Sequence, residues 1–169
     1  MAVDYFLKID GIPGESEDEK HTNEIEVIDF DWCETQTSNF AQGGGGGGGK
    51  VKMENFRFRT FLNSASPALM QSCAEGKHIK EAIFTCRKAG GGQKEYYKVT
   101  MEDVIVAGCK IQGAIESKVD DAGYAEGHPV EEISLNFGKI KWEYHPQKND
   151  GSLSSAKTGG YDLKKNKRV

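Results

Sequence analysis

The segment S-P-A-L-M-Q-S-C-A-E-G-K-H, residues 66–78, is the one stretch of the chain with helix signals at both of its ends. Ser66 is the expected N-cap, because its hydroxyl can accept a hydrogen bond from a free backbone N–H of the first turn. Pro67 suits the first helical position, and Gly76 can adopt the left-handed conformation that ends a helix. The apolar stripe of this short helix is expected to consist of Leu69, Met70 and Cys73.

The sequence on both sides of this helix has the pattern of strands and turns. Apolar residues alternate with polar ones from Val3 to Ile9, which predicts a strand with one buried face. Turns are expected around Gly108–Gln112 and in the acidic stretch that ends at Pro129, and a short strand around Tyr161–Leu163 in the polar tail of residues 147–169. Other strands are predicted at 24–36, from 51 onwards, at 79–88, 96–106 and 130–145, of which the last is the longest.

In four of these strands the alternation changes phase, so that apolar residues move from odd to even positions. A change of phase requires a bulge or a bend, and long strands that bend midway are typical of a closed barrel or a tightly coiled sandwich. The alternative is that each apolar set belongs to two short strands. The changes fall near Val27–Ile28, Glu54–Asn55, Met101–Val104 and Phe137–Ile140.

Length and composition favour one domain that folds without covalent cross-links, since 169 residues can bury a large core. The 21 glycines suit a turn-rich β protein, and the net charge of −4 gives no overall basic footprint for nucleic acid. The cysteines form no C-x-x-C pair; Cys33 and Cys73 are expected to be buried free thiols, although the spacing alone leaves disulfides open. The histidines lack zinc-ligand spacing relative to the cysteines.

The N-terminal residues have no secretory signal, and no window approaches the apolar length of a membrane span. We therefore expect a soluble chain made in the cytoplasm, which leaves the cell, if it does, without a cleaved signal. Seven consecutive glycines at 43–49 predict a mobile loop. This loop is not expected to bind phosphate, because Lys50 is followed by Val51 and a strand, where a P-loop has Ser or Thr and a helix. The cationic C-terminal end is interpreted as a solvated terminus, with contact to an acidic surface or nucleic acid as the alternative.

No arrangement of residues predicts catalysis, a cofactor or a metal site. Asp29, Asp31 and Glu34 resemble a carboxylate cluster, but the two aspartates alternate with apolar residues and predict a solvated strand face. The four histidines are expected to be unpaired or in extended loops: His21, His78, His128 and His145.

Several strands carry apolar side chains on both faces. Phe6 opposes Tyr5 and Leu7 in the alternation, and Phe61 opposes Phe56 and Phe58. A monomeric barrel needs only one apolar face. This surplus is expected to meet either the helix or a neighbouring subunit.

Taken together, these segments resemble the haemolysin-coregulated protein family, Hcp, the tube proteins of type VI secretion systems. The resemblance covers nearly the whole chain, and the order and spacing of the segments make it specific. It rests on D-Y-F-L-K-I-D-G-I-P-G-E-S (4–16), E-I-E-V-I-D-F-D-W (24–32), the glycine loop, F-R-F-R-T-F-L-N-S-A-S-P-A-L-M-Q-S-C-A-E-G-K-H (56–78), R-K-A-G-G (87–91), I-S-L-N-F-G-K-I-K-W-E-Y-H-P-Q-K-N-D-G-S (133–152) and the end near Tyr161.

The resemblance implies a mainly β fold: a β-barrel of two packed antiparallel sheets with one short flanking α-helix, over residues 1–169 as a single domain. It further implies a homo-hexameric ring, with rings that stack into a tube inside a contractile sheath, carry effectors in the lumen or on the tip spike, and are secreted. The chain is expected to be neither an enzyme nor a nucleic-acid or membrane protein. The alternative hypothesis is a small β-barrel binding module or a secreted effector enzyme that reuses the fold.

Overall fold

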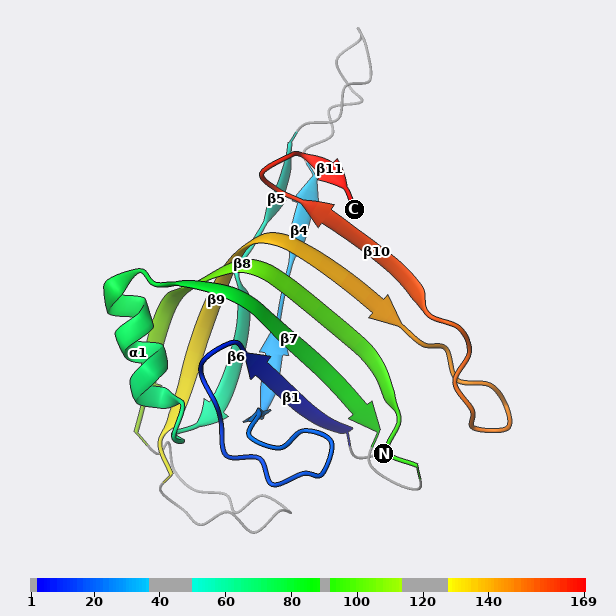
Figure 1. Ribbon diagram of the computed structural model, residues 1–169, viewed down its shortest axis with the longest axis horizontal. Helices are drawn as coiled ribbons and strands as arrows, with labels where there is room; N and C mark the ends of the chain where they lie inside the picture. Colours follow the sequence, from blue (N-terminus) through cyan, green and yellow to red (C-terminus); the bar gives the residue numbers. More distant parts are fainter. Residues whose placement is uncertain (1–2, 37–49, 89–91, 114–127) are drawn as a thin grey trace, which may run out of the picture.

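The computed structural model describes residues 3–36, 50–88, 92–113 and 128–169 (Figure 1). The described chain is mainly β, with one helix, and the glycine loop predicted at 43–49 lies outside these ranges. The elements in chain order are β1 Val3–Ile9, β2 Ile25–Val27, β3 Asp29–Asp31, β4 Glu34–Gln36, β5 Val51–Met53, β6 Phe56–Phe61, α1 Ser66–Glu75, β7 His78–Lys88, β8 Glu95–Gln112, β9 Val130–Tyr144, β10 Lys157–Asp162 and β11 Lys167–Arg168.

Antiparallel pairing closes most of these strands into a barrel. Hydrogen-bonded neighbours follow in the order β3, β6, β9, β8, β7, β1 and β2. Because β2 runs on into β3, the last strand of this order leads back to the first, and the barrel is closed by the chain itself. The first half of β9 pairs with β6 and its second half with β10, which carries β11 at the edge, while β4 and β5 form a separate ribbon beside the barrel (Figure 1).

The barrel interior is filled by the apolar residues that the alternation places on one face of each strand. Phe84 of β7 lies at its centre, with its ring centroid 4.4 Å from that of Phe30 and 5.1 Å from that of Phe56. Such aromatic contacts add to the free energy of simple area burial. The fully buried members of the core include Leu7, Phe56, Phe58, Phe84, Met101, Ile133, Leu135 and Ile140.

Two of the four predicted phase changes are bends within continuous strands, in β8 and β9. Asp103 has a positive φ of 54°, which turns β8 between two buried positions. The register from Glu102 opposite Lys139 to Val104 opposite Phe137 is unbroken, so both strands change phase together. A Cβ atom on Gly138 would lie 3.1 Å from the Cβ of Asp103, which explains the glycine at this close approach.

At the other two positions the alternative of two short strands is correct. The predicted strand 24–36 is three strands, since β2 pairs with β1, β3 with β6 and β4 with β5. Ile28 lies at the corner between β2 and β3, where its N–H donates to the carbonyl of Arg59 at 2.8 Å. The change near Glu54–Asn55 separates β5 from β6. Here the chain moves from one pairing partner to another, which alternation alone cannot show.

The turn predicted at Gly108–Gln112 is wrong, because these residues continue β8 and pair with the start of β9. A bulge between Val106 and Gly108 keeps the strand paired after the bend. β8 is consequently longer than β9, which the sequence predicted to be the longest strand. The strand predicted around Tyr161–Leu163 is confirmed as β10, although it begins earlier, at Lys157.

Helix α1 ends as the sequence predicts and begins differently. Gly76 has a φ of 62° and ends the helix, with its N–H donating to Cys73 O at 3.3 Å and that of Lys77 to Ser72 O at 3.0 Å. The N-cap, however, is Ala65 without a side-chain hydrogen bond. Ser66 is instead the first helical residue, with Pro67 after it.

The buried face of α1 is more polar than the predicted stripe. Leu69 is buried as expected, but Ser66 and Ser72 are its buried neighbours, while Met70 and Cys73 are only partly buried. The helix rests against β8. Small side chains allow it to approach the sheet closely.

Candidate functional site

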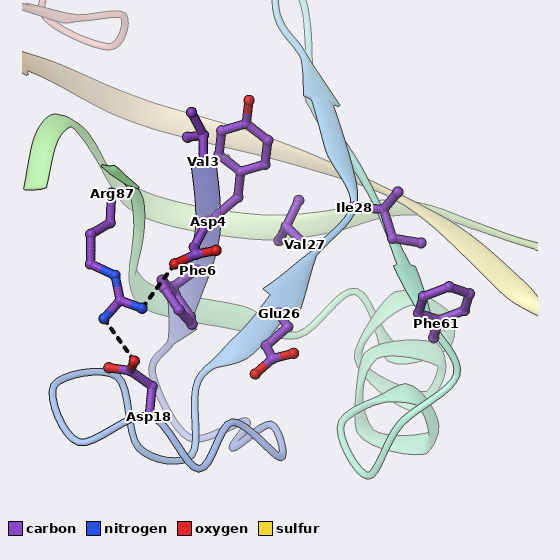
Figure 2. A pocket seen from close by; sticks show the side chains of 10 residues that line it. Val3, Asp4, Phe6, Asp18, Glu26, Val27, Ile28, Phe61 and Arg87 are labelled. Atoms are coloured by element: carbon purple, nitrogen blue, oxygen red, sulfur yellow. Dashed lines mark hydrogen bonds and ion pairs between the residues drawn. The ribbon is translucent and has the colours of Figure 1, made fainter. Parts of the chain in front are cut away.

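A groove of about 470 Å³ opens on the outer surface where β1, β2 and the end of β6 meet (Figure 2). One wall is apolar and is formed by Val27, Ile28 and Phe61, and the other contains the guanidinium of Arg87. Three carboxylates line it, from Asp4, Asp18 and Glu26. The groove therefore combines an apolar wall with an excess of negative charge.

Arg87 is buried at the base of this groove, with 4% of its side chain exposed. Its Nη2 donates to Asp4 Oδ2 at 3.0 Å, its Nη1 lies 2.7 Å from Asp18 Oδ2, and the guanidinium lies 4.7 Å from the ring centroid of Phe6. Burial alone would lower the pKa of Arg87, but hydrogen bonds to the two carboxylates outweigh it and raise the pKa. Carboxylates of β1 and of the loop between β1 and β2 thus hold the guanidinium in its charged form.

His21 is buried rather than unpaired, which corrects the sequence prediction. Its Nδ1 lies 2.8 Å from Glu24 Oε2, and its ring stacks on Phe6 with centroids 4.2 Å apart and planes inclined by 5°. The segment between β1 and β2 therefore covers Phe6. This residue of the apolar surplus is covered by a loop of its own chain, and both Phe6 and Phe61 line the groove.

A second candidate surface is the charged outer face of β3 and β6, around a hollow of about 440 Å³. Arg59 Nε donates to Asp29 Oδ1 at 2.8 Å, and Arg57 Nη1 lies 3.6 Å from Asp31 Oδ2. The hydrogen bond from Arg59 to Asp29 raises the pKa of Arg59. The predicted solvated face is confirmed for both aspartates, but the sequence prediction missed their arginine partners. The alternation F-R-F-R at 56–59 opposite D-F-D at 29–31 was the signal for them.

The remaining candidate residues do not converge on one site. Glu34 lies in the β4–β5 ribbon, and His145 Nε2 lies 2.9 Å from Glu143 Oε1 in the far half of the sheet. His78 is exposed at the start of β7, and His128 lies against the edge of the Phe61 ring. In the described ranges no three His, Cys, Asp or Glu side chains are grouped so that they could hold a metal ion.

All four cysteines have free thiols. Cys33 is exposed, contrary to the buried position expected for it, because the chain turns outward between β3 and β4. Cys73 and Cys109 are partly buried, and Cys86 is buried in β7. Within the described chain, no helix has the length and apolar character needed to cross a membrane.

Comparisons with known proteins agree with this architecture. The family model described as "Type VI secretion system effector, Hcp" matches residues 6–144. The chain is 38% identical over 161 residues to the protein hcp1 of Pseudomonas aeruginosa strain PAO1, an alignment that covers 95% of this chain and 91% of that protein. The chain therefore belongs to the Hcp family of type VI secretion system proteins.

Solved structures of the family have the same fold. The crystal structure of Hcp1 from Salmonella typhimurium is 40% identical and matches with a TM-score of 0.76, over 100% of both chains. A protein described as a type six secretion system protein is 26% identical and has a TM-score of 0.89 over 99% of this chain and 100% of that one. The predicted fold class, a mainly β barrel with one short flanking helix, is confirmed.

Proposed function

We propose that this chain is a structural subunit of the inner tube of a type VI secretion system. Six copies form a ring, rings stack into a tube, and the tube carries effector proteins to the outside. The single observation that carries the proposal is the match to the Hcp family through the whole barrel, from β1 to the end of β9.

The surface of the barrel supports an assembly role. Ile28 and Leu62 are large apolar side chains with more than a third of their surface exposed, beside the groove in which Phe61 lies. A ring whose subunits contact each other head to tail needs two different complementary surfaces on each copy. The apolar groove on one side of the barrel is suited to a further contact, between copies in successive rings.

The same proposal accounts for the dispersed titratable groups. The carboxylates of β3 are neutralised by arginines of β6 rather than arranged around a reacting atom. We propose that the chain acts without catalytic, cofactor-binding or metal-binding residues, as one domain over residues 1–169. Its partners are then further copies of itself together with the sheath, spike and effector proteins, and it is secreted.

Light scattering combined with negative-stain electron microscopy tests the proposal. We expect a particle of about six times the 18.6 kDa chain mass, with ring-shaped images of six-fold symmetry. Ile28→Lys should leave the rings intact and shorten their stacks, since it places a charge in the apolar wall of the groove. Thr22→Lys, an exposed position away from that wall, is the matched control. A monomer at micromolar concentration would contradict the proposal and favour a binding module.

A further inference from the structure

The groove of Figure 2 continues into a longer acidic surface. A neighbouring hollow of about 360 Å³ shares Glu26 and Phe61 with the groove and is lined further by Glu15, Glu17 and Leu62. The two hollows together form what we call the acidic groove. Its apolar part is the Ile28, Phe61 and Leu62 side, and its carboxylates come from β1, from β2 and from the loop between them.

The acidic groove has more negative charge than its own cation can neutralise. Arg87 already forms ion pairs with Asp4 and Asp18. Glu17 and Glu26 form no ion pair within the described part of the chain. A cationic partner with an apolar group would therefore complement both the charge and the wall of this groove.

The C-terminal end of the same chain has these properties. Lys165, Lys167 and Arg168 are exposed and form no ion pair in the described residues, whereas Lys164 is held by Asp103. Val169 is 45% exposed and is fixed in place by its N–H, which donates to Gly160 O at 3.2 Å. We call residues 165–169 the basic end. It includes β11, which within the described part of the chain pairs with β10 alone.

The two surfaces lie at opposite ends of the molecule. In Figure 1 the loop between β1 and β2 is at the bottom, and β10 and β11 are at the top. The basic end therefore cannot reach the acidic groove of its own chain. If a second copy brings the two together with the same orientation, the contact repeats from copy to copy without closing on itself.

We propose that the basic end of one copy docks in the acidic groove of the next, and that this contact joins successive rings along the tube axis. The inference rests on the proposed function, to which it adds the two contact surfaces and their chemistry. Lys165, Lys167 and Arg168 then face Glu17 and Glu26, and Val169 lies against the apolar wall. A second copy fits better than nucleic acid, because the chain itself supplies a groove complementary in both charge and apolar character.

Each such contact is weak and gains strength by repetition. Exposed ion pairs contribute little singly, but a partly enclosed apolar wall reduces screening by water. In a ring, every copy contributes one contact, and linked contacts bind far more tightly than one. Since salt shortens the Debye length from about 10 Å at 0.1 M to about 3 Å at 1 M, stacking should weaken as salt rises.

Carbodiimide cross-linking of the full-length protein tests the contact directly, since it joins only carboxylates and amines that already touch. Equal amounts of ¹⁴N- and ¹⁵N-labelled protein are mixed, and cross-linked peptides are read by mass spectrometry. We expect mixed-isotope links between Glu17 or Glu26 and Lys165 or Lys167. Their yield should fall at least tenfold between about 0.1 M and 1 M salt, in proportion to the screening.

Charge reversal supplies the decisive comparison. Glu17→Lys with Glu26→Lys should abolish the links and shorten the stacks, and so should Lys165→Glu with Lys167→Glu. A protein that carries all four changes should again form stacks, as judged by electron microscopy. The control Lys77→Glu with Lys80→Glu makes the same charge change at exposed positions beside α1 and should leave stacking unchanged.

The outcomes separate this inference from the proposed function. Rings without the expected links, or no recovery in the four-fold variant, would overturn the docking of the basic end and leave the ring proposal intact. Absence of rings in the unmodified protein would overturn the proposed function itself. If the protein forms none of the expected cross-links but binds a labelled oligonucleotide, the basic end is assigned to nucleic acid. That result would also overturn the inference.

Discussion

At the scale of single residues, Arg87 is the side chain on which the loop between β1 and β2 depends. It connects Asp4 of β1 to Asp18 of the loop and covers the ring of Phe6. The pattern of β7 gives no hint of this role. Arg87 is simply a polar residue after Cys86; alternation places it on the opposite face of β7, directly across from Asp4 of β1.

Arg87→Met should lower the free energy of unfolding by about 3 kcal/mol, because it keeps the bulk over Phe6 but leaves Asp18 without its cation. Urea unfolding at neutral pH measures the loss. Arg57→Met is the matched control: its side chain is 44% exposed, and the loss should stay within about 1 kcal/mol. Equal losses in the two variants would contradict the structural role of Arg87.

The pKa of Asp18 gives this cluster a pH dependence. Burial would raise that pKa, but the hydrogen bond from Arg87, with those from the backbone of Lys20 and His21, holds it below the ordinary 3.8. The stabilisation is therefore complete above this ordinary value and is lost as the pH falls below it. Unfolding curves at successively lower pH should show this loss in the unmodified protein and much less of it in Arg87→Met.

Glu131 is a buried carboxyl at the end of the barrel under α1, where its Oε1 accepts a hydrogen bond from Ser66 Oγ at 2.7 Å. Burial raises its pKa above the ordinary 4.5, and the Ser66 bond opposes the rise. A raised pKa means that the folded state holds the proton more tightly, so stability falls as the pH rises above 4.5 towards the raised value.

Glu131→Gln should remove this decline, and Ser66→Ala should extend it to higher pH. Thermal unfolding of the three proteins between pH 4 and pH 8 makes the comparison. If both variants follow the unmodified protein in parallel, the burial of an ionisable Glu131 has no part in its pH dependence.

At the scale of elements, the sequence predicted the type and position of each helix and strand better than it predicted which strands pair with each other. The C-terminal end of α1 and the strands β1, β7 and β9 follow from local signals, such as Gly76 and strict alternation. The division of residues 24–36 into β2, β3 and β4 does not, because it depends on which distant strand each part pairs with. The same is true of the start of α1, where the buried Glu131 determines the role of Ser66.

The candidate surfaces divide in the same way. The exposed carboxylates of β3 could be predicted, since alternation alone places Asp29 and Asp31 on the face opposite Phe30. The acidic groove could not, because it joins β1, the following loop, β2 and β6 with an arginine from β7. Residues that are distant in the sequence but close in the fold cannot be identified from the alternation of apolar and polar residues.

Gly76→Ala should lower the free energy of unfolding by about 1 kcal/mol. The residue has a φ of 62°, and a Cβ atom there would meet no other atom within 4 Å, so the cost comes from the backbone alone. Gly113→Ala is the matched control, since it has the same open surroundings without a positive φ. Equal effects in the two variants would show that α1 does not need the left-handed cap.

At the scale of the whole molecule, we expect the central strands of the closed barrel to unfold as a single cooperative unit. Cys86 reports on it, because β7 is paired on both sides, with β1 and β8. Burial raises the pKa of Cys86 to about 12, so almost none of it is the reactive thiolate near neutral pH. Its thiol should therefore react only when the barrel opens.

In native protein at pH 8, a disulfide reagent should label exposed Cys33 first and Cys86 last. The labelling rate of Cys86 should rise with urea as steeply as global unfolding does, since access requires β7 to leave both neighbours. Cys33→Ser should remove the fast phase and leave the slow one. A slow phase that does not depend on urea would mean that β7 opens locally and that the barrel is not one cooperative unit.

Because the four thiols are unpaired, a reductant should leave the melting temperature unchanged.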